Sequence, residues 1–257
     1  MEEVAPVGVF DNPNRGRPYE KRIQEIVGII SRDLREGLES IVLYGSYVAG
    51  DFVPGSSDIN FLILLKREED LHLDRIRDLC KKIKRKPIAE PLVLSEDYIN
   101  HSLDTFPLEY LNISRTCKVL YGSDFILNIK IKKSDLRLQC EREIKAKLLL
   151  LRQIYFSVGV KDKALKNSLL ASWKAIGPIL RGIYFILFSE FTSYMPDVIT
   201  RLSTHLKSSF EAIRAVYEIK TEKVIPPKGR INQLYKEYLH EFSLLAEIID
   251  EMEVIDG

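Results

Sequence analysis

Four residues in the first quarter of the chain have the types and the spacing that phosphate chemistry requires. Gly45 and Ser46 follow a short apolar run, and Asp58 and Asn60 stand twelve and fourteen residues after Ser46. A glycine lets the backbone approach a ligand closely, while a serine hydroxyl and the N–H groups of a following helix suit phosphate oxygens. If Asp58 begins a strand, Asp58 and Asn60 share one face and offer oxygens to a hard cation such as Mg2+. Phosphoryl transfer uses such a cation to neutralise charge and to align the attacking oxygen.

The elements that must position these residues follow from the hydrophobic periodicity. Strands are predicted at 41–44, 58–65, 88–94, 107–114 and 118–121. Helices are predicted at 19–38, 68–84 and 95–102, the last with Ser95 as its N-cap. This alternation indicates an α/β (α+β) unit with a small mixed sheet. We expect helices on one side of this sheet and Gly45, Ser46 and Asp58 at its open face.

Every pattern after about residue 134 is helical. Helices are predicted at 135–156, 163–188, 192–206, 208–218 and 230–253. The first of them has the apolar stripe Leu138, Ile144, Leu148, Leu151 and Tyr155. We therefore predict two domains, residues 1–133 and an all-α helical bundle at residues 134–257, with residues 1–17 as an extended arm. The bundle is expected to close over the open face of the sheet, with the ligand in the cleft between them.

A Gly-Ser turn followed by a hydrophobic–Asp–hydrophobic–carboxylate strand is the pattern of the nucleotidyltransferase superfamily, the DNA polymerase β-like fold, and this chain resembles it. Gly45, Ser46 and Asp58 match, whereas Asn60 stands where the family has its second carboxylate. Further similarity to bacterial and archaeal nucleotidyltransferase-domain proteins lies in the segments 106–113, 118–122 and 136–144. The resemblance covers roughly residues 20–190 and implies a transferase fold followed by a helical bundle like that of kanamycin nucleotidyltransferase.

The family takes a third carboxylate from a neighbouring strand, and the resemblance leaves two candidates for it. Glu109 and Asn112 are each flanked by apolar residues, and a regular strand would point them to opposite faces because they are three residues apart. If Glu109 fills the position, the catalytic and metal-binding set is Asp58, Asn60 and Glu109. If Asn112 fills it, two ligands are amides, and we expect no two-metal site because an amide oxygen carries no charge. Glu109 has an equally weighted alternative as a solvated residue of an edge strand.

Three cations of the second half are candidates for binding the nucleotide. Lys145 matches the basic residue that related transferases place on the first bundle helix, with a surface charge paired to Glu141 as the alternative. Lys174 and Arg181 lie two turns apart on a very apolar helix, where they would share one face and form an anion site. Asp51 closes the short helix after Ser46 and is expected either to orient the Gly-Ser turn or to be a simple helix-end carboxylate.

Composition excludes several classes of protein. The chain has 257 residues with 38 Lys and Arg against 37 Asp and Glu, and this balance disfavours a nucleic-acid partner. The two cations in the apolar stretch 168–188 argue against a membrane span. Three scattered cysteines and an acidic start indicate a reduced, cytoplasmic protein without a secretory signal.

The resemblance implies two alternative functions. The first is Mg2+-dependent transfer of a nucleoside monophosphate from a nucleoside triphosphate to a hydroxyl of a small molecule or a protein. The second is a catalytically degenerate module that binds nucleotide or interacts through its bundle. Analogy also predicts a homodimer across the bundle.

Overall fold

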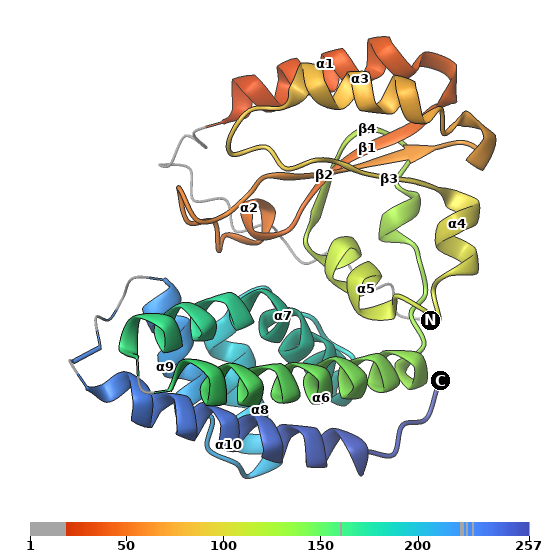
Figure 1. Ribbon diagram of the computed structural model, residues 1–257. Helices are drawn as coiled ribbons and strands as arrows, with labels where there is room; N and C mark the ends of the chain where they lie inside the picture. The colour runs from red at the N-terminus through yellow and green to blue at the C-terminus, as the bar shows by residue number, and fades with distance from the viewer. Residues whose placement is uncertain (1–18, 160, 222–223, 225, 228, 257) are drawn as a thin grey trace.

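A four-stranded mixed sheet forms the centre of the first half of the chain in the computed structural model (Figure 1). The structure describes residues 19–256 except 160, 222, 223, 225 and 228, so the predicted arm at 1–17 lies outside the described residues. The strands are β1 (Leu38–Tyr44), β2 (Asn60–Leu65), β3 (Leu92–Ser95) and β4 (Cys117–Gly122), in the order β3-β2-β1-β4. β1 is antiparallel to β2 and β4, and β2 is parallel to β3. The predicted small mixed sheet is confirmed.

Both faces of the sheet are covered by helices, so the prediction of helices on one side is wrong. Helices α1 (Glu20–Leu34) and α3 (Leu73–Ile83) pack on the face that carries Phe61, Ile63 and Leu65. Helices α4 (Glu96–His101) and α5 (Pro107–Arg115) pack on the face that carries Leu62 and Leu64. β2 is an unbroken apolar run for this reason, since a strand that is buried on both faces does not alternate with polar residues.

Several predicted boundaries differ from the observed ones because short elements intervene. Helix α1 ends at Leu34, and a 3-10 turn at Arg35–Gly37 leads directly into β1. The four-residue helix α2 (Ser46–Ala49) follows β1, and further 3-10 turns lie at Glu68–Asp70 and Phe125–Leu127. Ser95 is the N-cap of α4 as predicted, because its hydroxyl accepts a hydrogen bond from the Tyr98 N–H.

The segment 107–114 is a helix and not the predicted strand. Pro107 occupies the first turn of α5, where a missing N–H costs no hydrogen bond. Leu108 and Leu111 pack against the second half of the chain, while Tyr110 and Ile113 pack against the sheet. Because α5 lies between two layers and is apolar on two sides, its sequence lacks the one-sided stripe that identifies a surface helix.

Five helices form the second half: α6 (Lys133–Val158), α7 (Asp162–Phe188), α8 (Met195–Leu206), α9 (Glu211–Lys220) and α10 (Arg230–Asp250). Their buried residues form one apolar cluster, as expected for a bundle. In α6 the buried stripe includes Ile144, Leu148 and Leu151, but Leu138 is exposed, contrary to the prediction. α7 is long and apolar enough by composition to cross a membrane, yet half of that stretch is buried inside the protein. The division at residues 133 and 134 stays a prediction.

The two halves meet where α5 packs against α6 and α7 (Figure 1). Gln139 of α6 accepts a hydrogen bond from the Leu108 N–H at 2.7 Å and donates one to the Glu109 carboxylate at 2.6 Å. A Cβ atom on Gly182 of α7 would lie 2.8 Å from both Leu108 Cδ1 and Cys140 Sγ. A side chain at position 182 would therefore force the buried Leu108 and Cys140 side chains to move.

Alanine substitutions at two helical glycines test this packing and should change stability in opposite directions. Gly182→Ala should lower the free energy of unfolding by about 1–3 kcal/mol, because the added methyl overpacks the junction of three helices. Gly28→Ala in the interior of α1 is the control, since its Cβ would meet only the end of the Arg32 side chain at 3.5 Å or more, and it should raise stability by up to ~1 kcal/mol through helix propensity. Urea denaturation of both variants measures the effect. Equal changes of the same sign would contradict the packing described here.

Candidate functional site

The turn at Gly45 has a backbone conformation that is essentially restricted to glycine. Its φ of 83° and ψ of −155° lie in a region that side chains exclude. The Gly45 N–H donates to the Thr116 carbonyl at 3.0 Å, and the Gly45 carbonyl accepts from the N–H groups of Val48 and Ala49. The chain is therefore held at the end of β1 while it changes direction into α2, and half-buried Ser46 becomes the first residue of that helix.

Asn60 lies directly across from this turn. It is the first residue of β2 and pairs with Tyr44 in the antiparallel ladder. The position of a Cβ on Gly45 would be 3.0 Å from Asn60 Nδ2, so the amide covers the open side of the glycine. Asp58 precedes β2 and is exposed, while Ile59 between them is fully buried. Strand alternation then gives Asp58 and Asn60 the same face, which is the face covered by α5.

The loop between Ser46 and Asp58 is fixed on two sides. Tyr47 and Phe52 pack edge to face at 5.3 Å, and Tyr19 before α1 contacts both rings. On the other side Asp51 Oδ2 forms an ion pair of 2.7 Å with Arg181 Nη2 of α7. Burial raises the pKa of Tyr217 of α9 to about 12, with the Asp51 charge adding to that increase and Arg181 opposing it. Tyr217 is thus part of the same contact between the halves.

The residues at this edge do not form a resident two-metal centre. Within the described part of the chain, no group of three His, Cys, Asp or Glu residues could hold a metal ion. Asp58 supplies one carboxylate and Asn60 one neutral amide oxygen. Two Mg2+ ions need several anionic ligands to offset their charge, and Asp58 and Asn60 by themselves supply a single negative charge, so these two residues alone do not fit a bound metal pair.

Neither candidate for the third ligand lies on a neighbouring strand. Glu109 is in the first turn of α5, where the helix dipole favours a carboxylate, and its Oε2 accepts from Gln139 at 2.6 Å. Asn112 donates to the Leu108 carbonyl within the same helix at 2.8 Å. Residues three apart on a helix lie on the same side, so the prediction that Glu109 and Asn112 point to opposite faces of a strand is wrong. Glu109 instead binds a side chain of α6, and Asn112 binds the backbone of its own helix.

A carboxylate that the sequence reasoning missed does lie beside the start of β2. The Ile59 N–H donates to the Pro87 carbonyl at 2.8 Å, and the Ala89 N–H donates to the Ile59 carbonyl at 3.0 Å. Glu90 follows this paired segment and forms an ion pair of 2.8 Å with Lys84. The predicted strand at 88–94 contained Glu90, and its position next to the strand of Asp58 was the available signal.

The three predicted nucleotide-binding cations have different surroundings. Lys145 pairs with Glu141 at 2.7 Å and with Asp250 at 3.2 Å, which is the alternative expected for it. Arg181 pairs with Asp51, so its charge is already matched by a carboxylate. Lys174 is exposed on α7, two turns before Arg181. The role of Lys145, Lys174 and Arg181 in nucleotide binding stays a prediction.

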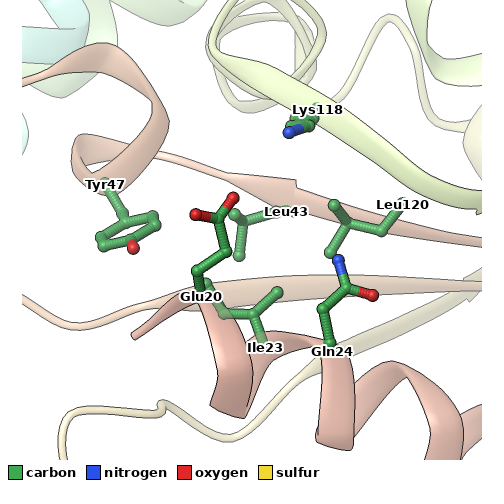
Figure 2. Close-up of a pocket in the computed structure, with 7 residues that line it drawn as sticks. All are labelled: Glu20, Ile23, Gln24, Leu43, Tyr47, Lys118 and Leu120. Atoms are coloured by element: carbon green, nitrogen blue, oxygen red, sulfur yellow. The ribbon is translucent and has the colours of Figure 1, made fainter. Parts of the chain in front are cut away.

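Two hollows in the described part of the chain are not lined by Gly45, Ser46 or Asp58. One is lined by Glu20, Ile23 and Gln24 of α1 with Leu43, Tyr47, Lys118 and Leu120, as Figure 2 shows, and its volume of about 20 Å3 suits a single water. The other, of about 410 Å3, is lined by charged residues of α1 and α3 and by Arg35. The cleft predicted between the halves stays a prediction.

Substitution of Gly45 should damage the turn more than substitution of a neighbouring glycine. Gly45→Ala should lower the free energy of unfolding by about 1–3 kcal/mol, because alanine avoids this conformation and its methyl meets Asn60. Gly50→Ala is the control, because Gly50 has an ordinary left-handed φ of 89° and ψ of 3° with no atom within 4 Å of the new methyl. Chemical denaturation compares the two. An equal loss in both variants would mean that the contact with Asn60 has no energetic effect.

Comparison with known proteins agrees with the fold and the motif. The family model described as "Nucleotidyltransferase domain" matches residues 23–112, which include the turn, Asp58 and Asn60. A protein of Methanocaldococcus jannaschii named "Putative protein adenylyltransferase MJ0604" is 32% identical over 105 residues, which is 40% of this chain and 97% of that protein.

The similarity in structure extends beyond that domain. The crystal structure of spectinomycin adenyltransferase AAD(9) from Enterococcus faecialis with ATP and spectinomycin superposes with a TM-score of 0.50 at 15% identity. The match covers 87% of this chain and 99% of that one, so it includes helices of the second half and supports the same fold. The motif, the domain match and the relative that the chain covers almost completely lead to one conclusion: the chain belongs to the nucleotidyltransferase family.

Proposed function

We propose that the chain transfers a nucleoside monophosphate from a nucleoside triphosphate to a hydroxyl group of another protein. The observation that carries this proposal is the glycine-specific turn at Gly45, with Ser46 after it and Asp58 and Asn60 at the adjacent end of β2. Ser46 offers a hydroxyl and Asp58 an exposed carboxylate at the same edge of the sheet. A serine hydroxyl suits a phosphate oxygen, and a carboxylate suits the proton of an incoming hydroxyl.

The reaction exchanges one ester bond for another at the α-phosphorus. The acceptor oxygen forms a bond to this phosphorus, the bond to the bridging oxygen breaks, and pyrophosphate leaves with the bonding electron pair. The acceptor proton passes to a base, and Asp58 is the carboxylate available for this at the turn. Mg2+ belongs to the substrate here, because nucleoside triphosphates carry it in solution, and this chain's own donors are too few to retain a metal pair.

The class of acceptor follows from the relatives. The relative named as a protein adenylyltransferase is matched over 97% of its length, which favours ATP as donor and a protein hydroxyl as acceptor. The structure of AAD(9) contains ATP and spectinomycin, which makes a small-molecule hydroxyl the second choice. Its low identity supports a shared fold alone, so the protein acceptor is preferred.

A second candidate function is nucleotide binding without turnover, and Asn60 is the observation that favours it. Replacement of the second carboxylate by an amide removes one negative charge from the position that faces the turn. Such a site can retain phosphate contacts from Gly45 and Ser46 while it loses the charge that organises the transfer. Binding and transfer must therefore be measured separately.

Restoring the carboxylate tests whether Asp58 and Asn60 share a cation position. Asn60→Asp should lower the melting temperature in chelator, because two carboxylates repel each other, and should recover it by a few degrees in Mg2+ through binding to the folded state. The wild type should respond less, and Asp58→Asn should not respond. Thermal melting of the three proteins across a Mg2+ series gives the comparison. Equal shifts in all three would show that the two residues do not face a common position.

Transfer is tested with labelled nucleotides and the full chain. Calorimetry with each nucleoside triphosphate and Mg2+ should detect binding, and label from [α-32P]ATP but not from [γ-32P]ATP should appear on protein acceptors in an extract. Asp58→Asn should abolish the label. Binding without label would favour the second candidate, and label on small molecules alone would change the acceptor class. Failure of every nucleotide to bind would contradict both functions.

A further inference from the structure

The segment that joins the Gly45–Ser46 turn to Asp58 is attached to the bundle at two points. Asp51, just after α2, binds Arg181 of α7. Ser56, two residues before Asp58, accepts a hydrogen bond from Lys220 Nζ at the end of α9. The bundle thus contacts both ends of the loop that separates the turn from the carboxylate.

The contact at Arg181 is the more buried of the two. The Arg181 side chain is 11% exposed and the Asp51 side chain 27% exposed, and their Nη2 and Oδ2 atoms are 2.7 Å apart. The same Nη2 donates to the Ser193 carbonyl at 2.9 Å, which fixes the guanidinium relative to the segment that precedes α8. A charge pair that is largely removed from water is screened little by solvent, so its geometry is held more firmly than that of a surface pair.

Backbone hydrogen bonds connect Asp51 to the Gly45–Ser46 turn. The Asp51 N–H donates to the Ser46 carbonyl at 3.0 Å, and the Gly50 N–H donates to the same oxygen at 3.0 Å. The Asp51 carboxylate and the Ser46 carbonyl are therefore linked through one residue. Asp51 follows Gly50, the C-cap of α2, so a displacement of the Asp51 side chain pulls on a backbone that is bonded to Ser46, the first residue of this helix.

We infer that Arg181 is a positioning residue, which acts through Asp51 to hold the Gly45–Ser46 turn and the following loop in the conformation that receives phosphate. The effect of Arg181 on nucleotide binding rests on the function proposed above. The effect of Arg181 on the conformation of residues 46–57 is independent of that function. The role differs from the anion site expected from sequence, because Arg181 contacts a carboxylate of the first half and no phosphate is required for its effect.

Four variants and one control separate this role from general stabilisation. Arg181→Met removes the charge and keeps the length, Arg181→Lys keeps the charge, Asp51→Asn removes the acceptor charge, and the fourth combines Arg181→Met with Asp51→Asn. Arg230→Met is the matched control, since it also breaks an Arg–carboxylate pair of 2.7 Å, but one that joins two exposed residues of α10. Thermal melting reports the fold of each variant.

The first measurement is hydrogen–deuterium exchange of peptides that cover residues 46–57, with labelling from milliseconds to seconds and no nucleotide. Arg181→Met and Asp51→Asn should each exchange about tenfold faster there than the wild type, because the N–H groups of Gly50 and Asp51 lose their fixed acceptor. The double variant should be no faster than either single variant, because the two residues act through one contact. Arg181→Lys should restore most of the protection, and Arg230→Met should match the wild type in this segment.

The second measurement is the affinity for ATP with Mg2+, which should fall about tenfold in Arg181→Met and recover in Arg181→Lys. Unchanged exchange in residues 46–57 of a folded Arg181→Met protein would overturn the inference, as would acceleration of equal size in every peptide. If Arg181→Met does not fold, Asp51→Asn and Arg181→Lys decide by the same criteria. If the wild type binds no nucleotide, the proposed function fails, and the exchange data still decide the role of Arg181.

Discussion

The rest of the structure depends on the burial of the central strand pair from both sides. β1 and β2 are apolar on two faces, so one layer of helices leaves half of their side chains in water. The second layer includes α5, which in turn has an apolar side that faces away from the sheet. That side needs a cover, and α6 and α7 provide it. The association of the bundle with the transferase fold is thus a consequence of how the sheet is buried.

The same arrangement explains which parts of the fold can be predicted from sequence. The long helices can be recognised because their apolar residues recur with helical periodicity, as in α1, α6, α7 and α10. The strands β1 and β2 can be recognised because each contains an unbroken apolar run. α5 cannot be recognised, because its two apolar sides make a helix resemble a strand over eight or nine residues. The unbroken apolar run of β2 is the sequence signal that both faces of the sheet are covered, and the prediction of helices on one side did not take it into account.

The predictability of the candidate site divides in a similar way. Gly45, Ser46, Asp58 and Asn60 are close in sequence, and the ladder between β1 and β2 brings them together as their spacing indicates. Partners that come from distant segments have no local pattern. The pairing of Asp51 with Arg181 spans 130 residues, and the placement of Glu109 depends on Gln139 in another helix. The sequence therefore singles out Arg181 as a cation in a very apolar helix, but it does not reveal that Asp51 is the partner of this cation.

The strand order also affects how the protein behaves toward other chains. The two edges of the sheet are β3, with four residues, and β4, whose pairing with β1 is interrupted by an irregularity at Ile41 and Val42. β4 ends at Gly122, where a φ of 79° turns the backbone away from the extended direction. Short, bent edges are poor templates for strands of a neighbouring molecule. The strongly apolar strands β1 and β2 have partners on both sides, which protects the most aggregation-prone segments of the sheet.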